Sequence, residues 1–237
     1  MAINGSGGLG EAYGVPIGPN EPIRDDLHIW VDNRYDDFVS STWQDVSGNT
    51  NNLSEINAED SDWKGWYWDI DGSNEYFRKT SAASPGNANY SIEIWALRDA
   101  AGLTSTDYYA DGRAPDDTND WYWLSSTSND SDFKGRVRFN WSNGHGNWHQ
   151  IVTTMSSTST NGCKTYINGE LKGQGTGNLT WNSGYFTLGA RYSATGPWDG
   201  RLGCCRVYHK TLSAEEVYHN FLVDASKFQV EEVGKGI

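Results

Sequence analysis

Carboxylates are the first residues in this sequence that could carry chemistry, and their spacing bears on glycoside hydrolysis. That reaction needs two carboxylates held on either side of the scissile bond. The run "SIEIW" offers Glu93 alone, and "WDID" offers Asp69 and Asp71 beside a turn. Neither run supplies a pair of carboxylates that would face one cleft. The sequence therefore predicts a protein that is not an enzyme and that requires no cofactor.

Histidines and cysteines form the second candidate set. His145 and His149 lie four residues apart, a spacing that on a helix would suggest a metal site. They flank the start of an expected strand, so His145 is assigned to a loop and His149 to the strand as an ordinary polar residue. Strand alternation sends the adjacent Cys204 and Cys205 to opposite faces, where they cannot readily share a disulfide or a metal. A pairing of Cys163 with Cys204 stays open as an alternative.

Acidic loops are candidates for calcium, which takes oxygen ligands from carboxylates and carbonyls. The densest is "DGRAPDDTND", whose candidate ligands are Asp111, Asp116 and Asp117. Calcium is therefore a candidate ligand, although not a required one.

Aromatic residues near polar loops are candidates for stacking against sugar rings, since such sites pair an apolar surface with a few placed polar groups. The chain has 12 tryptophans, and those inside expected strands are assigned to the core. The candidate stacking residues are Trp63, Trp66, Tyr109, Trp121, Trp123 and Trp198. The alternative is that these rings seal the ends of the fold or form an oligomer interface.

Short runs rich in β-branched and aromatic residues, separated by turn residues, predict an all-β fold. The runs are LHIWV, WYWDI, EYFR, YSIEIWAL, DWYWLSS, GRVRFNW, WHQIVTTM, KTYIN, YFTLGA and CCRVYH. Asn168-Gly169 predicts a two-residue hairpin, because both positions tolerate a positive φ, and Asp71-Gly72 predicts a second hairpin.

One helix is predicted, close to the end of the sequence. Ser213 can cap it, Glu216 can complete a capping box, and Leu212 can pack against Val217. The expected apolar stripe consists of Ala214, Val217, Tyr218, Phe221 and Leu222. About ten short strands with one terminal helix predict a β-sandwich.

The ends of the sequence differ from its middle. Residues 1–24 are rich in Gly and Pro and predict an extended N-terminal arm. That arm is either a disordered leader or an attachment arm that becomes ordered against a neighbouring subunit. Residues 25–224 form one predicted domain, and residues 225–237 a C-terminal tail that could cross to a partner.

Charge and composition exclude several classes of partner. The net charge of −13 disfavours binding to nucleic acid and to anionic lipid. No segment is apolar enough to span a bilayer, and the first residues lack the pattern of a secretory signal. Three cysteines fit a protein that folds in a reducing cytoplasm.

Four motifs occur in a characteristic order. "STWQDVSGNTNNL" and "WDIDGSNEYF" come first, followed by "WHQIVTTMSSTSTNGCKTYINGELKG" and "TLGARYSATGPWDGRLGCCRVYHKTLSAEEVYHNF". Together they cover roughly residues 26 to 223. This order resembles the laminin G-like, concanavalin A-like jelly-roll family.

The resemblance implies two curved antiparallel sheets that meet ligands on rim loops or on the concave face. It also implies a structural calcium near an Asp-Gly turn, to which Asp71 corresponds. Gly203-Cys204-Cys205 stand where relatives often carry an acidic residue, which argues against a complete calcium site. The predicted fold is thus an all-β jelly-roll sandwich with one short C-terminal helix and an extended N-terminal arm.

Members with these motifs occur in structural proteins of tailed phages and in surface proteins of marine bacteria. With the arm and the acidity, this favours a non-enzymatic virion protein, a capsid decoration or fibre component. It would be made in the host cytoplasm and exposed on the particle surface. The arm would join capsid subunits or other virion proteins, the domain could grip cell-surface glycans, and a homo-oligomer is expected. The alternative is an extracellular carbohydrate-binding module or adhesin of a bacterial surface or secreted protein.

Overall fold

The computed structural model describes residues 20–35, 41–99, 107–114, 121–125, 130–140 and 145–230. The strands of one sheet are β1 (Leu27–Asp32), β4 (Trp68–Asp71), β6 (Tyr90–Arg98), β11 (Trp148–Met155), β12 (Cys163–Ile167), β13 (Glu170–Gly175) and β15 (Asp199–Tyr208). Those of the other are β2 (Thr42–Trp43), β3 (Leu53–Ile56), β5 (Tyr76–Lys79), β7 (Asp107–Asp111), β8 (Tyr122–Ser125), β9 (Asp130–Phe133), β10 (Val137–Asn140) and β14 (Phe186–Leu188). The helical segments are η1 (Asp60–Asp62) and α1 (Ala214–Ala225).

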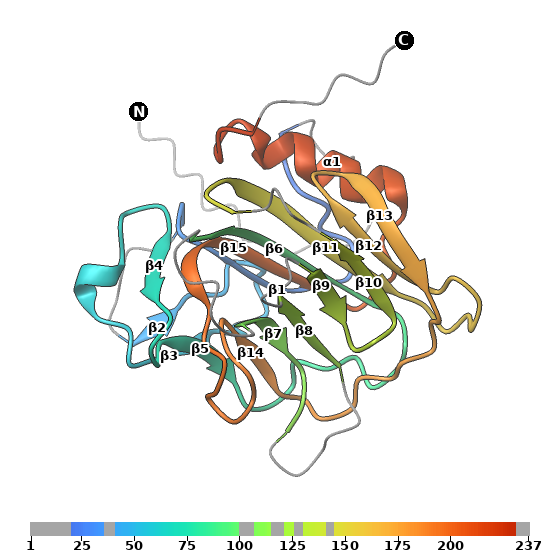
Figure 1. Cartoon of the computed structure of the whole chain (residues 1–237), viewed down its shortest axis with the longest axis horizontal. Coiled ribbons are helices and arrows are strands. Elements are labelled where there is room, and N and C mark those ends of the chain that lie inside the picture. The colour runs from blue at the N-terminus through green and yellow to red at the C-terminus, as the bar shows by residue number, and fades with distance from the viewer. Residues whose placement is uncertain are drawn as a thin grey trace, which may run out of the picture.

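In this described part of the chain, the predicted jelly-roll sandwich is confirmed (Figure 1). Sheet A has the order β1-β15-β6-β11-β12-β13, with β4 also paired to β15. Sheet B has the order β10-β9-β8-β7-β14-β5-β3-β2. The strand pairs within each sheet are antiparallel.

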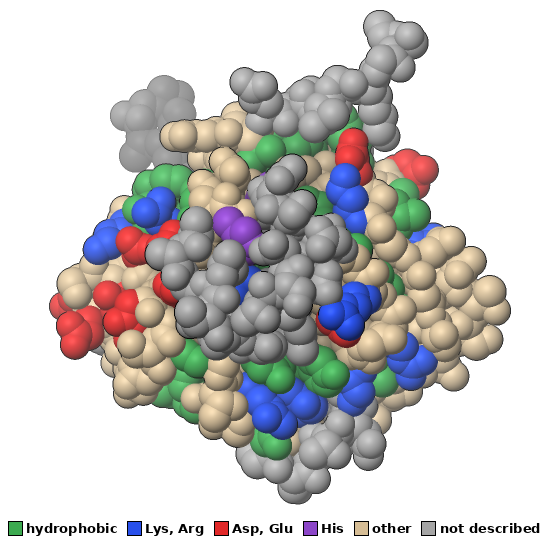
Figure 2. All heavy atoms as spheres, viewed as in Figure 1, with side chains coloured by type: hydrophobic (Ala, Val, Ile, Leu, Met, Phe, Trp, Pro, Cys, Tyr) green, Lys and Arg blue, Asp and Glu red, His purple; other side chains and the backbone are tan. Residues whose placement is uncertain are grey.

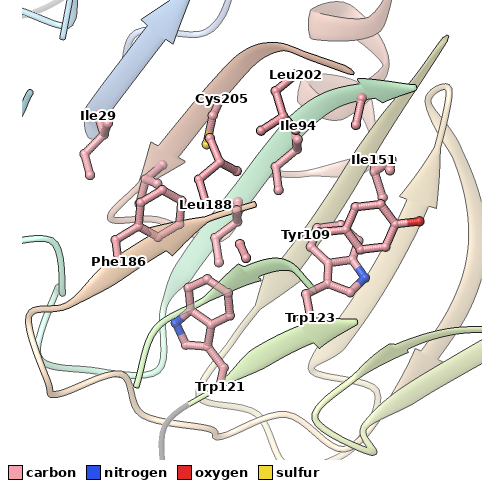
Figure 3. Packing of buried hydrophobic residues seen from close by; sticks show 14 of the residues in the cluster. Ile29, Ile94, Tyr109, Trp121, Trp123, Ile151, Phe186, Leu188, Leu202 and Cys205 are labelled. Atoms are coloured by element: carbon pink, nitrogen blue, oxygen red, sulfur yellow. The ribbon is translucent and has the colours of Figure 1, made fainter. Parts of the chain in front are cut away.

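The core lies between the two sheets. Figure 3 shows side chains from sheet A, such as Ile94 and Ile151, directed toward Phe186 and Leu188 of sheet B. The opposite face of sheet A is buried as well, because α1 covers it: every residue of β6 is buried. Trp95 on that face packs against Phe221 of α1, with ring centroids 6.1 Å apart. Sheet A thus lies between sheet B and α1, whereas the outer face of sheet B is directed toward solvent.

The predicted capping box of α1 is confirmed. Ser213 Oγ accepts a hydrogen bond from the Glu216 backbone N–H at 3.2 Å, and Glu216 Oε2 accepts one from the Ser213 N–H at 2.8 Å. The predicted apolar stripe is wrong in part, because Ala214 is exposed and Leu222 is 38% exposed. No helix among the described residues is long and apolar enough to cross a membrane.

The buried face of α1 includes two polar side chains, Asn220 and Asp224. They are buried because sheet A places charges beneath them. Arg206 Nη2 lies 2.6 Å from Asp224 Oδ2, and Arg206 Nη1 lies 2.9 Å from Glu93 Oε1. Burial alone would lower the pKa of Arg206, but Asp224 and Glu93 raise it well above its usual range.

Two further cations complete this charge network. Arg34 Nη2 lies 2.7 Å from Asp224 Oδ1 and 2.5 Å from Asp32 Oδ2. Lys227 Nζ lies 2.7 Å from Asp32 Oδ1. Three cations therefore balance the charge of three carboxylates in the space between sheet A and the segment formed by α1 and the residues after it. We call Asp32, Arg34, Glu93, Arg206, Asp224 and Lys227 the buried ion network.

Both ends of the described chain pack on the α1 side of sheet A. Ile23 is buried, and its N–H donates to Asn220 Oδ1 at 2.8 Å. The arm predicted over residues 1–24 therefore ends too late, since Ile23 belongs to the folded domain. Phe228 stacks on Trp95 at 4.4 Å, and Gly203 permits this, because a Cβ there would lie 2.3 Å from the Phe228 ring. Residues 1–19 and 231–237 lie outside the described residues.

The two predicted hairpins have different outcomes. Asn168 and Gly169 both adopt positive φ, 50° and 76°, and join β12 to β13 as expected. Asp71-Gly72 is not a hairpin, because β4 belongs to sheet A and β5 to sheet B. Only Gly72 of that pair has a positive φ, 75°, and the turn carries the chain from one sheet to the other.

Candidate functional site

The outer face of sheet B carries a row of polar residues. Arg78 of β5 lies opposite Thr187 of β14, and Thr187 lies opposite Asp111 of β7. Asp111 in turn lies opposite Tyr122 of β8. Because directly opposed residues in a sheet point to the same side, the row crosses four strands on the face away from the core.

Arg113, two residues beyond the row, is the centre of the face. Its Nε donates to Asp111 Oδ1 at 2.9 Å and its Nη2 to Asp111 Oδ2 at 2.5 Å. The same guanidinium lies 4.4 Å from the ring centroid of Tyr122 and 5.0 Å from that of Tyr192. Burial alone would lower the pKa of Arg113, but the hydrogen bonds to Asp111 raise it. The cation is therefore fixed and holds both rings by cation–π contacts.

Two more arginines flank Tyr192. Arg78 Nη2 donates to the Tyr192 backbone carbonyl at 2.6 Å, and its Nε donates to Thr187 Oγ1 at 3.2 Å. The guanidinium of Arg191 lies 5.0 Å from the Tyr192 ring centroid. We define the arginine–tyrosine face by the residues Arg78, Tyr108, Arg113, Tyr122, Arg191 and Tyr192.

This face is accessible to a ligand. Tyr108, Tyr122 and Tyr192 are each half-buried, so part of each side chain meets solvent. In Figure 2, Lys and Arg side chains gather with hydrophobic ones in the lower part of the view, where sheet B lies. Rings held in place beside fixed hydrogen-bond donors can stack on a sugar and bind its hydroxyl groups. The carboxylate of Asp111 is committed to Arg113, so the geometry suits binding.

The sequence prediction of Tyr109 as a stacking residue is wrong, because β7 contains a bulge. The pairing with β8 shifts between Tyr108 and Ala110, which sends Tyr109 and Ala110 both to the core side. Tyr109 is fully buried, with its ring 4.4 Å from that of Trp198. Its neighbour Tyr108 takes the outward position.

Trp121, Trp123 and Trp198 are also core residues and not surface platforms. Each has an exposed fraction of 0%. Figure 3 shows Trp121 and Trp123 directed into the space between the sheets. These rings fill the sandwich because each supplies a large apolar surface to a chain that is otherwise polar.

Trp63 and Trp66 are half-buried, Trp63 against the core between the sheets and Trp66 against the cluster beneath α1. Trp63 forms a backbone bridge with Trp68 at the start of β4. Trp66 packs against Trp148 and Phe228 with ring centroids 5.5 and 6.0 Å apart. The structure therefore does not bring either ring to the arginine–tyrosine face.

The four predicted calcium ligands do not come together in the described residues. Asp71 is exposed in the turn after β4, and Asp111 is bound to Arg113 in sheet B. Asp116 and Asp117 lie outside the described residues. The closing strand does supply a carboxylate opposite Asp71, namely Asp199. In the part of the chain that is described, no group of three or more His, Cys, Asp or Glu could hold a metal ion.

The sequence indicated Asp111 only as a candidate calcium ligand and did not indicate the arginines of the face. Arg78, Arg113 and Arg191 are far apart in the sequence, and only strand pairing brings them together. The available signal was the alternation in "EYFRK", which places Arg78 and Tyr76 on the side of β5 opposite Phe77. The guanidinium of Arg78 indeed lies 4.6 Å from the Tyr76 ring centroid.

The histidines have the positions that the sequence predicted. His149 lies in β11 and His145 precedes that strand. Asn168 Nδ2 lies 3.3 Å from His149 Nδ1, at the hairpin between β12 and β13. Burial, with a contribution from His145, lowers the pKa of His149 to about 4.

Acidification is expected to destabilise the domain through His149. The unfolded chain binds a proton at this ring below a pKa near 6.5, while the folded chain binds it only near 4. Above pH 6.5, His149 therefore does not reduce the free energy of unfolding. As the pH drops toward 4, this group lowers the free energy of unfolding by about 3 kcal/mol. Urea unfolding at pH 7 and pH 4.5 measures the loss. A His149→Gln variant should lose less between the two pH values, and an equal loss would contradict the assignment.

The three cysteines are free and buried. As predicted, Cys205 faces the core between the sheets and Cys204 faces the cluster beneath α1. Burial raises the pKa of the Cys163 thiol to about 12 and raises the pKa values of Cys204 and Cys205 as well. A thiol at such a pKa is a poor nucleophile at neutral pH.

Thiol labelling is expected to be slow in the folded protein and complete after unfolding. Burial excludes the reagent and keeps the thiols protonated. Titration with a disulfide reagent in denaturant should then count three thiols per chain. A count of one would instead show the Cys163–Cys204 disulfide that the sequence left open.

The chain is thus a two-sheet sandwich that carries fixed aromatic and cationic side chains on the outer face of one sheet. The chain belongs to the concanavalin A-like lectin/glucanases superfamily, whose family model matches residues 71–218. No curated protein matches the sequence.

Solved structures with similar folds include carbohydrate-related proteins. The sialidase of Trypanosoma rangeli, in complex with sialic acid, matches with a TM-score of 0.63 at 14% identity, over 87% of this chain and 34% of the sialidase. The chain thus spans about a third of that protein. Domain 4 of AbnA, a GH43 extracellular arabinanase from Geobacillus stearothermophilus in complex with arabinotriose, matches with a TM-score of 0.55 at 17% identity, over 81% and 97% of the two chains.

A third similar structure is the receptor binding domain of botulinum neurotoxin C/D mosaic serotype. Its TM-score is 0.59 at 14% identity, over 86% of this chain and 52% of that one. At these identities, the likeness shows the fold.

Proposed function

We propose that this protein is a non-enzymatic carbohydrate-binding domain whose ligand lies on the arginine–tyrosine face. The observation that carries the proposal is the Arg113 guanidinium, fixed by Asp111 and in contact with the rings of Tyr122 and Tyr192. The superfamily and the arabinotriose complex of a similar domain support a sugar as the ligand class.

Binding at this face would combine two kinds of contact. The half-buried rings of Tyr122 and Tyr192 offer apolar surface to a sugar ring. Arg78 and Arg113 are held by hydrogen bonds to Thr187 and Asp111, so little side-chain freedom is lost when a ligand binds. The absence of an enzymatic reaction is part of the proposal, because the one carboxylate in the described row is paired with a cation.

Truncation of either tyrosine on the face should weaken glycan binding while leaving the fold intact. Tyr122→Ala and Tyr192→Ala are each expected to weaken glycan binding by about thirtyfold, the cost of losing a central aromatic contact. Affinity for the hits of a glycan array, followed by calorimetry, measures the effect. Tyr67→Ala is the matched control, since Tyr67 is also half-buried beside an arginine, with Arg201 5.2 Å from its ring centroid.

Unchanged affinity in both face variants would contradict the proposed site. A chelator added to the assay should leave the affinity unchanged, because the described face offers no group of metal ligands. Loss of binding with the chelator would instead indicate a metal-dependent site near the acidic turn at Asp71 and Asp199.

Display on a phage particle is the proposed setting of this domain, and the sequence alone supports it. The Gly- and Pro-rich residues 1–24 would attach it to capsid or other virion proteins, and the net charge of −13 suits an exposed surface. Deleting residues 1–19 and assaying particle incorporation tests the attachment. Unchanged incorporation would refute it and would leave the carbohydrate-binding proposal intact.

A further inference from the structure

Most described arginines of this acidic chain are paired with carboxylates. Those in ion pairs include Arg24, Arg34, Arg98, Arg113, Arg201 and Arg206. Arg78 and Arg191 differ, because their contacts are with Thr187, the Tyr192 backbone and tyrosine rings. Within the described residues, neither has a carboxylate at ion-pair distance. Two uncompensated guanidinium groups therefore stand together on one face of a protein with a net charge of −13.

These two groups converge on the same residue. Arg78 Nη2 donates to the backbone carbonyl of Tyr192, and the Arg191 guanidinium lies 5.0 Å from the Tyr192 ring centroid. The Nε of Arg191 is buried and has no hydrogen-bond partner among the described residues. A buried donor that lacks an acceptor carries a desolvation cost, which an oxygen atom of a ligand would remove.

The two described carboxylates near this face already have hydrogen-bond partners. Asp111 is held by Arg113, and Asp132 Oδ1 accepts a hydrogen bond from the Gly135 N–H at 2.5 Å. Lys134 adds a further cation, with its Nζ 5.6 Å from the Tyr122 ring centroid. Among the described residues of this face the cations outnumber the carboxylates, while the net charge of the whole chain would repel an anion elsewhere.

We propose that the ligand of the arginine–tyrosine face is an anionic glycan, whose carboxylate or sulfate is bound by Arg78 and Arg191 while a sugar ring packs on Tyr192. This inference rests on the carbohydrate-binding function proposed above. A planar guanidinium presents two parallel N–H donors, which match the paired oxygens of a carboxylate or a sulfate. A neutral sugar would leave both positive charges without a partner.

The test compares polysaccharides that share a backbone and differ only in charge. One pair is polygalacturonate and its fully methyl-esterified form, and the other is a sulfated galactan and the same galactan after desulfation. The anionic member of at least one pair should bind at least about tenfold more tightly, the scale expected when one charged hydrogen-bonded contact is added. Its affinity should fall as NaCl is raised, because salt screens the attraction. The two pairs distinguish a carboxylate from a sulfate ligand.

Charge-removing variants assign the effect to the two arginines. Arg78→Gln and Arg191→Gln should each lower the affinity for the anionic polysaccharide by about tenfold, with thermal unfolding close to that of the parent. Arg201→Gln is the matched control, since Arg201 also stacks on a tyrosine but lies on the β4 side of the molecule. It should leave the affinity unchanged.

The other outcomes separate the two proposals. Equal affinity for the neutral and anionic members of both pairs would overturn the anionic ligand and keep the carbohydrate-binding function. Failure to bind any glycan of a broad array would overturn the function and this inference with it. Binding of a single-stranded oligonucleotide as tightly as the best anionic glycan would overturn the glycan as the ligand class.

Discussion

Replacement of Arg206 by methionine is expected to lower the free energy of unfolding by about 3–5 kcal/mol. Arg206 is fully buried and is the only residue of the buried ion network that contacts both Glu93 and Asp224. Methionine has a similar length and fills the space, so the effect comes from charge. Without the guanidinium, two buried carboxylates lose their nearest cation. Urea unfolding followed by tryptophan fluorescence measures the change.

The control for this experiment is an exposed ion pair on the same strand. Arg201 Nε lies 3.3 Å from Asp69 Oδ1, and both side chains are about one-third exposed. Arg201→Met should cost under about 1 kcal/mol, because solvent screens such pairs. A loss of that small size in Arg206→Met would show that water reaches Glu93 and Asp224, and that the network is not a closed interior.

Replacement of Trp121 by alanine is expected to cost about 3–5 kcal/mol of stability. Trp121 meets the ring of Trp181 edge-on at 5.1 Å and stacks on Phe133 at 5.7 Å. Removing the indole leaves a cavity that the rigid sheets on either side cannot close. Chemical denaturation measures the loss, and Trp121→Phe, which keeps an aromatic ring, should lose less.

This prediction distinguishes two roles for Trp121, namely a residue of the core and a residue that stacks on a glycan. A platform at Trp121 would affect glycan affinity and leave stability nearly unchanged. Trp66→Ala serves as the comparison, because Trp66 is half-buried and should cost less than Trp121→Ala. If Trp121→Ala kept its stability and lost ligand affinity, the original sequence interpretation would be restored.

The sequence was sufficient to predict the sandwich because two of the longest strands of sheet A, β6 and β11, are rich in β-branched and aromatic residues. Each of the ten predicted runs overlaps a strand of the structure. The strands that it missed, β2, β3, β7 and β9, are short, and runs such as "LSEI" and "DSDF" have weak strand propensity. They form because neighbouring strands pair with them. Pairing with a neighbouring strand depends on the tertiary structure, so the local sequence does not predict these four strands.

The site was harder to predict than the fold. Alternation assigned Cys204 and Cys205 correctly to opposite faces, but it failed at Tyr109, where a bulge adds one residue. The polar residues around Trp121 and Trp123 suggested that these rings are exposed, although the backbone at the start of β8 directs both of them inward. The unpaired charge of Arg78 and Arg191 depends on which carboxylates lie nearby in space, and local sequence does not contain that information.

The anchoring of Ile23 and Phe228 beside α1 determines how the domain can be presented. Both ends of the described chain lie on the helix-covered side of sheet A, and the arginine–tyrosine face is on the far side of sheet B (Figure 1). Any protein or particle joined through residue 20 or residue 230 is therefore attached behind the domain. The arginine–tyrosine face, which is the proposed binding surface, then points away from its support, and many copies on one support could engage a glycan layer at once.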